Sequence, residues 1–156
     1  AGAAFVGEHA FSRTLAAGRP DGQDLAQLRA FAAAAADKIG ALTGLPEAPV
    51  AVRGESPVRP YYTPRDRNGN PVNILKVKPL TDPEKCDQCG LCAALCPMGS
   101  IDPADAAHIP GICIKCCACV KKCPTGAKYY TDEKYLYHQH ELEEGFARRA
   151  EPELFL

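Results

Sequence analysis

One cysteine pattern occurs twice in the chain. The first motif has the spacing C-x2-C-x2-C-x3-C-P and consists of Cys86, Cys89, Cys92, Cys96 and Pro97. The second motif repeats it 27 residues later with Cys113, Cys116, Cys119, Cys123 and Pro124. Of the nine cysteines, only Cys117 has no counterpart in the other motif. Clustered thiols either pair as disulfides or bind metal, so this duplication constrains the class of protein more than any other feature.

Three chemistries use clustered thiols, and the spacing distinguishes them. An odd cysteine count and thiols three residues apart argue against a disulfide framework. Structural zinc sites usually join two separated C-x2-4-C knuckles, whereas here three thiols fall within seven residues. The spacing therefore favours an iron–sulfur cluster, for which this run is typical.

The duplication also predicts which cysteines share a cluster. A short loop with a cysteine at every third position covers three corners of a cubane, so the fourth ligand comes from elsewhere. In a doubled run, the fourth cysteine of each motif ligates the cluster of the other motif. We therefore assign one [4Fe–4S] cluster to Cys86, Cys89, Cys92 and Cys123. The other is assigned to Cys113, Cys116, Cys119 and Cys96.

The unpaired cysteine and its basic neighbours have plainer explanations. Cys117 is interpreted as a small buried apolar residue rather than a redox sensor or a spare ligand. A solvated surface is the expected role of the nearby basic side chains, rather than a docking patch for an acidic partner. These side chains are Lys115, Lys121, Lys122 and Lys128.

Composition sets limits on the rest of the chain. Leu, Ile, Val and Phe together number only 31 of 156 residues, so a hydrocarbon core is thin and a staple such as a disulfide or a metal is expected. The net charge of −1 gives no electrostatic footprint for nucleic acid. The longest apolar runs, such as 31–36, are too short to span a bilayer.

Local patterns predict the elements before the cysteines. Residues 1–7 are predicted to form a short buried strand, and a helix follows the Asp21 and Asp24 caps and runs to about Gly40. The helix is expected to bury a face formed by Leu25, Leu28, Ala32, Ala35 and Ile39. Seven prolines in residues 45–80 predict an extended connector, with a tight turn at Asn68-Gly69-Asn70.

Further elements are predicted around and after the cysteines. We expect residues 128–130 to pair as a strand with residues 80–85. A last helix is predicted from about His138 to Arg149, with Leu142 and Phe146 on one face. Residues 151–156 are apolar enough that we expect them to dock on the rest of the chain. His138 and His140 lie two apart, which argues against a metal site on one helical face.

Three stretches carry a family resemblance. The segments CDQCGLCAALCP and CIKCCACVKKCPTGA, within residues 82–130, resemble bacterial-type two-cluster ferredoxins. AAFVGEHAFS, the GRPD turn and the Ala-rich helix, within residues 1–42, resemble the last strand and helix of the flavodoxin-like domain in flavodoxin–ferredoxin fusion proteins. The ELEEGFARRAEPELFL ending is similar to the C-terminus of that family.

The resemblance implies an α+β chain in which a two-cluster ferredoxin-like domain with short hairpins and helices follows a strand–helix remnant of a flavodoxin-like α/β domain. The expected divisions are residues 1–44 (remnant), 45–80 (connector), 81–131 (two-cluster domain) and 132–156 (helix and tail). The chain begins without Met, and we expect a fragment. FMN is expected only in the full-length parent, because the flavin phosphate-binding loop lies upstream of residue 1.

The expected function is one-electron transfer by two [4Fe–4S] clusters, coupled to the flavodoxin-like domain in the full-length protein. The alternative is an electron-wire module of a larger flavin-dependent oxidoreductase. A third possibility is that the clusters are structural staples only. The expected partners are redox proteins and the flavodoxin-like domain in cis, with neither nucleic acid nor a membrane span, and the expected location is cytoplasmic.

Overall fold

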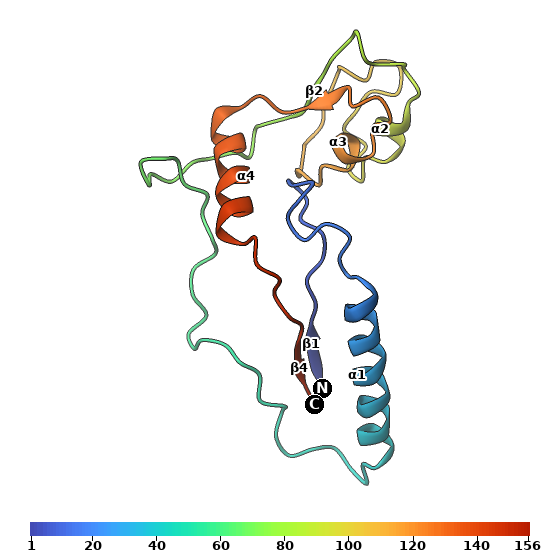
Figure 1. Ribbon diagram of the computed structural model, residues 1–156, viewed down its shortest axis with the longest axis vertical. Coiled ribbons are helices and arrows are strands. Elements are labelled where there is room, and N and C mark those ends of the chain that lie inside the picture. Colours follow the sequence, from blue (N-terminus) through green and yellow to red (C-terminus); the bar gives the residue numbers. More distant parts are fainter. The chain divides into compact units, whose positions relative to one another are not determined.

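The computed structural model describes residues 1–156, and Figure 1 shows its small helices and strands. The fold is a mixture of helices and short strands, in agreement with the predicted α+β class. Two compact units are present. The terminal unit comprises Ala1–Glu8, Ala16–Tyr61 and Ala147–Leu156, and the cysteine unit comprises His9–Leu15 and Tyr62–Phe146. The predicted division at residues 44, 80 and 131 stays a prediction.

The two ends of the chain pair in the terminal unit. Strand β1 (Gly2–Ala4) is antiparallel to strand β4 (Glu153–Phe155), with Ala3 opposite Leu154. The predicted docking of residues 151–156 is thus confirmed, as strand pairing. A short strand forms within residues 1–7 as predicted, but its predicted burial is wrong, because Ala3 and Ala4 are exposed.

The main helix of the terminal unit is α1 (Gly22–Gly40), which confirms the predicted bounds. The Asp21 carboxylate accepts hydrogen bonds from the backbone N–H groups of Gln23 and Asp24, and the Asp24 carboxylate accepts one from Asp21. These reciprocal bonds satisfy donors that a helix start otherwise leaves free. The expected burial of the apolar face is wrong, because Leu25 is 39% and Ile39 66% exposed.

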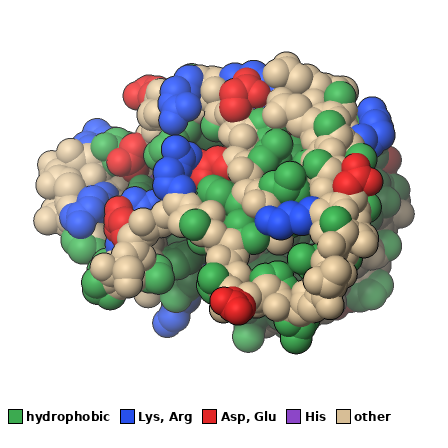
Figure 2. All heavy atoms as spheres, turned by 90° about the horizontal axis from the view of Figure 1, so that it is seen from below, with side chains coloured by type: hydrophobic (Ala, Val, Ile, Leu, Met, Phe, Trp, Pro, Cys, Tyr) green, Lys and Arg blue, Asp and Glu red, His purple; other side chains and the backbone are tan.

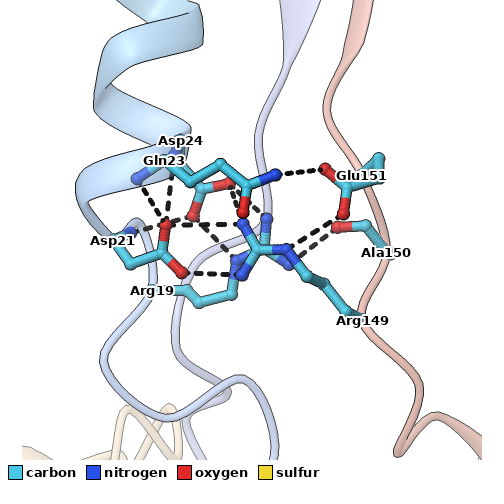
Figure 3. A network of polar contacts seen from close by, with 7 residues as sticks. All are labelled: Arg19, Asp21, Gln23, Asp24, Arg149, Ala150 and Glu151. Carbon is cyan, nitrogen blue, oxygen red and sulfur yellow. Dashed lines mark hydrogen bonds and ion pairs between the residues drawn. The ribbon is translucent and has the colours of Figure 1, made fainter.

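A polar network ties the start of α1 to the C-terminal segment (Figure 3). The Asp24 carboxylate is fully buried and accepts hydrogen bonds from the guanidinium groups of Arg19 (Nε, 2.8 Å) and Arg149 (Nη2, 3.1 Å). Arg149 also donates to Asp21 at 2.6 Å, and Arg19 donates to the Ala150 carbonyl at 2.7 Å. A buried carboxylate requires such partners. Arg149 and Ala150 lie more than a hundred positions away in the sequence from their partners Asp21, Asp24 and Arg19.

The segment between α1 and the cysteines contains no helix, as predicted for its proline content. The predicted tight turn is confirmed by an antiparallel bridge between Arg65 and Pro71. The Asp66 carboxylate accepts the backbone N–H groups of Asn68 and Asn70 at 2.9 Å each. Gly69 closes the turn with φ +80°, a conformation that glycine adopts without steric cost.

The cysteine unit contains two short helices, a two-stranded sheet and one longer helix. Strand β2 (Leu80–Thr81) is antiparallel to strand β3 (Lys128–Tyr129), which confirms the predicted pairing. Helix α2 (Leu91–Ala94) and helix α3 (Ala118–Lys121) each follow the first part of a cysteine motif.

Helix α4 (Glu133–Gly145) starts earlier and ends earlier than predicted. The Asp132 carboxylate accepts the Tyr135 backbone N–H at 2.9 Å and so fixes the first turn. The inward face presents Tyr135 and His138, both buried, whereas Phe146 is exposed. The prediction of residues 138–149 and of a Leu142–Phe146 face is therefore wrong.

The hydrocarbon core of the cysteine unit is small, as the composition predicts. Val72, Ile74, Cys117 and Tyr135 are buried together. Phe11 and Tyr130 pack against this cluster, with ring centroids 5.0 and 4.1 Å from that of Tyr135.

None of the helices combines the length and the hydropathy that a membrane span requires. Figure 2 shows basic and acidic side chains interspersed on the face in view.

Candidate metal centre

The two motifs share a backbone conformation as well as a cysteine spacing. Helices α2 and α3 occupy equivalent positions, 27 residues apart. Residues with a left-handed backbone recur in the same register: Gln88 with Lys115, Gly90 with Cys117, and Gly99 with Gly126, with φ between +56° and +72°. Left-handed residues within a loop turn successive N–H groups towards one side, and such concave sites recur around iron–sulfur centres.

The first cavity gathers cysteines from both motifs. It is an empty space of about 320 Å³, part of which is open to solvent. The cysteines that line it are Cys86, Cys89 and Cys92 of the first motif and Cys123 of the second.

The second cavity has the reciprocal composition. It measures about 380 Å³, again with a part open to solvent. The cysteines that line it are Cys113, Cys116, Cys117 and Cys119 of the second motif and Cys96 of the first. Its remaining lining is largely apolar and includes Ile101, Ile109 and Tyr130. The structure thus brings each fourth cysteine to the first three of the other motif.

The thiols that line each cavity are the type of donor that an iron–sulfur cubane requires. No three His, Cys, Asp or Glu side chains of the chain lie close enough together to hold one metal ion. A zinc site needs four donors that converge on one point. A cubane instead binds one thiolate at each of four separated iron corners, so cysteines around the border of a cavity fit it.

Both fourth cysteines lie in surroundings that stabilise a thiolate. Burial opposes ionisation of Cys96, but hydrogen bonds from the backbone N–H groups of Ser100 and Met98 lower the pKa of its thiol overall. The Ser100 N–H lies 3.3 Å from the Cys96 sulfur. At Cys123, burial is likewise outweighed by the Thr125 hydroxyl and the Lys128 backbone N–H, which lower the pKa. Thiolates are the form that ligates metal.

Cys119 has the opposite environment. Burial raises the pKa of its thiol to about 12, because a thiolate in apolar surroundings loses its hydration. A bound cation reverses this preference, since a coordinating thiol is deprotonated outright. The second cavity is therefore suited to a thiolate at Cys119 when a metal group supplies positive charge.

Cys117 is buried, as predicted, with 3% of its surface exposed. Its sulfur lies 3.3 Å from the Lys115 carbonyl oxygen and 3.3 Å from the Tyr135 hydroxyl. A second hydroxyl, that of Tyr130, lies 3.9 Å away. Sequence reasoning missed both tyrosines, because nothing in a linear pattern brings them to this thiol.

Two of the lysines interpreted as solvated are in fact buried. Lys115 is 6% and Lys128 3% exposed. The Lys115 ammonium donates to the Leu75 carbonyl at 2.7 Å, and the Lys128 ammonium donates to the Ala106 carbonyl. Lys121 donates to the His9 carbonyl at 2.6 Å. These ammonium groups connect loops of the cysteine unit, so the solvated-surface interpretation is wrong for Lys115 and Lys128.

Comparison with known families agrees with the first motif. A family model described as a 4Fe-4S binding domain (Fer4) matches residues 79–102. The chain contains an iron–sulfur binding domain. The match spans β2, α2 and all four cysteines of the first motif, and it supports electron transfer through at least one [4Fe–4S] cluster. No curated protein and no solved structure shows a significant match to the chain.

Proposed function

We propose that the chain holds two [4Fe–4S] clusters and acts as a one-electron carrier. Cys86, Cys89, Cys92 and Cys123 hold the first cluster. The second is held by Cys113, Cys116, Cys119 and Cys96. The observation that carries this proposal is the reciprocal lining of the two cavities, each bordered by three cysteines of one motif and the fourth of the other.

The repeated backbone supports extending the iron–sulfur assignment to the second motif. The family match covers the first motif only. The second motif has the same spacing, an equivalent short helix and left-handed residues in the same register. A loop with equivalent donors and equivalent N–H directions is able to hold an equivalent group.

The chain's own residues hold the clusters and control their surroundings. When bound, a [4Fe–4S] cluster supplies reversible one-electron transfer. Backbone N–H groups such as that of Ser100 donate to ligand sulfurs, and such hydrogen bonds are one of the protein's means of setting the reduction potential. Ile101, 5% exposed, keeps water from one wall of the second cavity.

We further propose that a longer parent chain couples the cysteine unit to a flavodoxin-like domain, which alone binds FMN. The resemblance of residues 1–42 supports this coupling. The exposed Leu25 and Leu28 of α1 also support it, since an apolar helix face usually packs on another surface. Clustered cysteines that bind iron–sulfur clusters instead of pairing as disulfides favour a reducing compartment, and we propose the cytoplasm.

The second candidate is an electron-wire module of a larger flavin-dependent oxidoreductase. The same coupling to a flavin domain favours it. The two candidates differ in whether the full-length protein converts a small molecule without an added carrier. Turnover under those conditions supports the module, and its absence supports the carrier.

Metal analysis of the anaerobically purified chain tests the central proposal. We expect about eight iron and eight acid-labile sulfide atoms per chain, the content of two cubanes, and an EPR signal after reduction by a low-potential donor. About four iron atoms would refute the second cluster. A preparation that contains only zinc would refute both clusters, and clusters that resist reduction would refute the carrier.

A further inference from the structure

We propose that Tyr130 donates a hydrogen bond to the Cys113 sulfur and raises the reduction potential of the second cluster alone. Cys117 and Tyr135 act as positioning residues that hold the Tyr130 hydroxyl in this direction. The inference rests on the proposed function, because it requires Cys113 to be a ligand. It gives the one cysteine outside both ligand sets a role.

Four side chains form a continuous polar line beside the second cavity. The Tyr130 hydroxyl lies 3.9 Å from the Cys113 sulfur and 3.9 Å from the Cys117 sulfur. The Tyr135 hydroxyl lies 3.3 Å from the Cys117 sulfur. The rings of Tyr130 and Tyr135 stack with centroids 4.1 Å apart and planes inclined by 25°. Tyr135 is 1% exposed, so water does not compete for this arrangement.

The chemistry of the two sulfurs fixes the direction of the Tyr130 hydrogen. A hydroxyl carries one hydrogen, and both sulfurs are equally distant from it. As a ligand, Cys113 is a thiolate and only accepts hydrogen bonds. Cys117 holds no iron and keeps an S–H that is able to donate. The Tyr130 hydrogen therefore points to Cys113.

The positioning residues, Cys117 and Tyr135, act on the Tyr130 hydroxyl through its oxygen. The Cys117 sulfur accepts from the Tyr135 hydroxyl, and its single S–H hydrogen is shared between the Lys115 carbonyl oxygen at 3.3 Å and the Tyr130 oxygen at 3.9 Å. Hydrogen bonds arranged in one direction polarise one another. A donor to a ligand sulfur favours the reduced cluster, which carries one more negative charge, and so raises the potential.

The first cavity has no tyrosine at the equivalent position, and the hydroxyl beside its ligand sulfurs is that of Thr125, 3.6 Å from the Cys123 sulfur. The residue equivalent to Cys117 in the first motif is Gly90, and the residue equivalent to Tyr130 is Pro103. Neither side chain has a polar hydrogen. Tyr130 lines the second cavity and not the first, so the effect of its hydroxyl is expected at the second cluster alone.

The decisive variant is Tyr130→Phe in the full chain, which removes the hydroxyl and keeps the stacked ring. Both clusters are titrated anaerobically with dithionite and redox mediators and followed by EPR. Cys89→Ser and Cys116→Ser, an equivalent pair of exposed ligands, assign the signals to the first and second cluster. At a fixed potential we expect the reduced-to-oxidised ratio of the second cluster to fall about three- to tenfold, as for the loss of one hydrogen bond.

Matched variants separate a hydrogen bond from a structural effect. Tyr129→Phe removes an exposed hydroxyl on the preceding residue and is expected to shift neither cluster. Cys117→Ala is expected to shift the second cluster in the same direction as Tyr130→Phe but less far. Cys117→Ser, which keeps a donor and an acceptor, is expected to restore the potential. All four keep the full iron content.

The measured potentials and the iron content together distinguish failure of the Tyr130 role from failure of the proposed function. An unshifted second cluster in Tyr130→Phe, or equal shifts of both clusters, overturns the inference. If the unaltered chain holds about eight iron atoms in that case, the proposed function survives and only the role of Tyr130 fails. If the unaltered chain holds about four, the two-cluster function and this inference fail together.

Discussion

Cys96→Ala tests the exchange of ligands between the two motifs most directly. Cys96 belongs to the first motif by sequence, but it lines the second cavity. The substitution leaves three ligand thiols there and all four in the first cavity. We therefore expect loss of the second cluster, about four of about eight iron atoms, with the first cluster intact.

Alkylation followed by peptide mass spectrometry reads out which cluster is lost. A thiol bound to iron is protected, so with both proposed clusters bound we expect the anaerobic unaltered chain to have only the buried Cys117 free. In Cys96→Ala three thiols become free, those of Cys113, Cys116 and Cys119. Cys116 is exposed and is expected to react first, while Cys89, equally exposed, stays protected.

Cys123→Ala is the matched control, because it makes the equivalent change in the second motif. The same reasoning expects the reverse pattern, with Cys89 labelled and Cys116 protected. Labelling of Cys89 in Cys96→Ala would show that each motif holds its own cluster. That result would refute the ligand sets proposed from the two cavities.

Three further predictions concern stability. Gly111→Ala places a Cβ within 2.9 Å of the Ser100 backbone and is expected to cost about 1–3 kcal/mol in denaturant unfolding, while Gly44→Ala, in open space, changes little. Ile101→Ala empties a wall of the second cavity and is expected to cost about 2–5 kcal/mol in the same assay; a cost under 1 kcal/mol would contradict this packing role. The hydrogen bond from Arg19 lowers the pKa of Asp24, so its stabilisation is complete above the unfolded value of roughly 4 and is lost as the pH falls through the lower folded value. The protection of the α1 amides, measured by hydrogen exchange from about pH 6 to pH 2 and corrected for the pH dependence of intrinsic exchange, is expected to fall below roughly pH 4, and constant protection would contradict the role of this pair.

Features that depend on neighbours in the sequence were predictable. The cap at Asp21 and Asp24, the turn at Gly69 and the strand pair β2–β3 all match the prediction. The cap and the turn rest on hydrogen bonds that span a few residues, whereas the pairing of β2 with β3 joins segments that are far apart in the sequence. The prediction placed helix α4 too close to the C-terminus because it relied on the spacing of Leu142 and Phe146. Its actual signal was Asp132, a capping residue three positions before Tyr135.

By itself, the sequence determined the thiol chemistry, because cysteine spacing limits which metal groups a short loop can surround. Only the tertiary structure decided which distant groups meet. In the folded chain, the buried Lys115 and Lys128 donate hydrogen bonds to backbone carbonyls. Arg149 pairs with Asp24, and the rings of Tyr130 and Tyr135 stack beside Cys117. These contacts follow from how loops close over a small core. The spacing of residues along the chain does not predict these long-range contacts, because the same polar residues are also common on solvated surfaces.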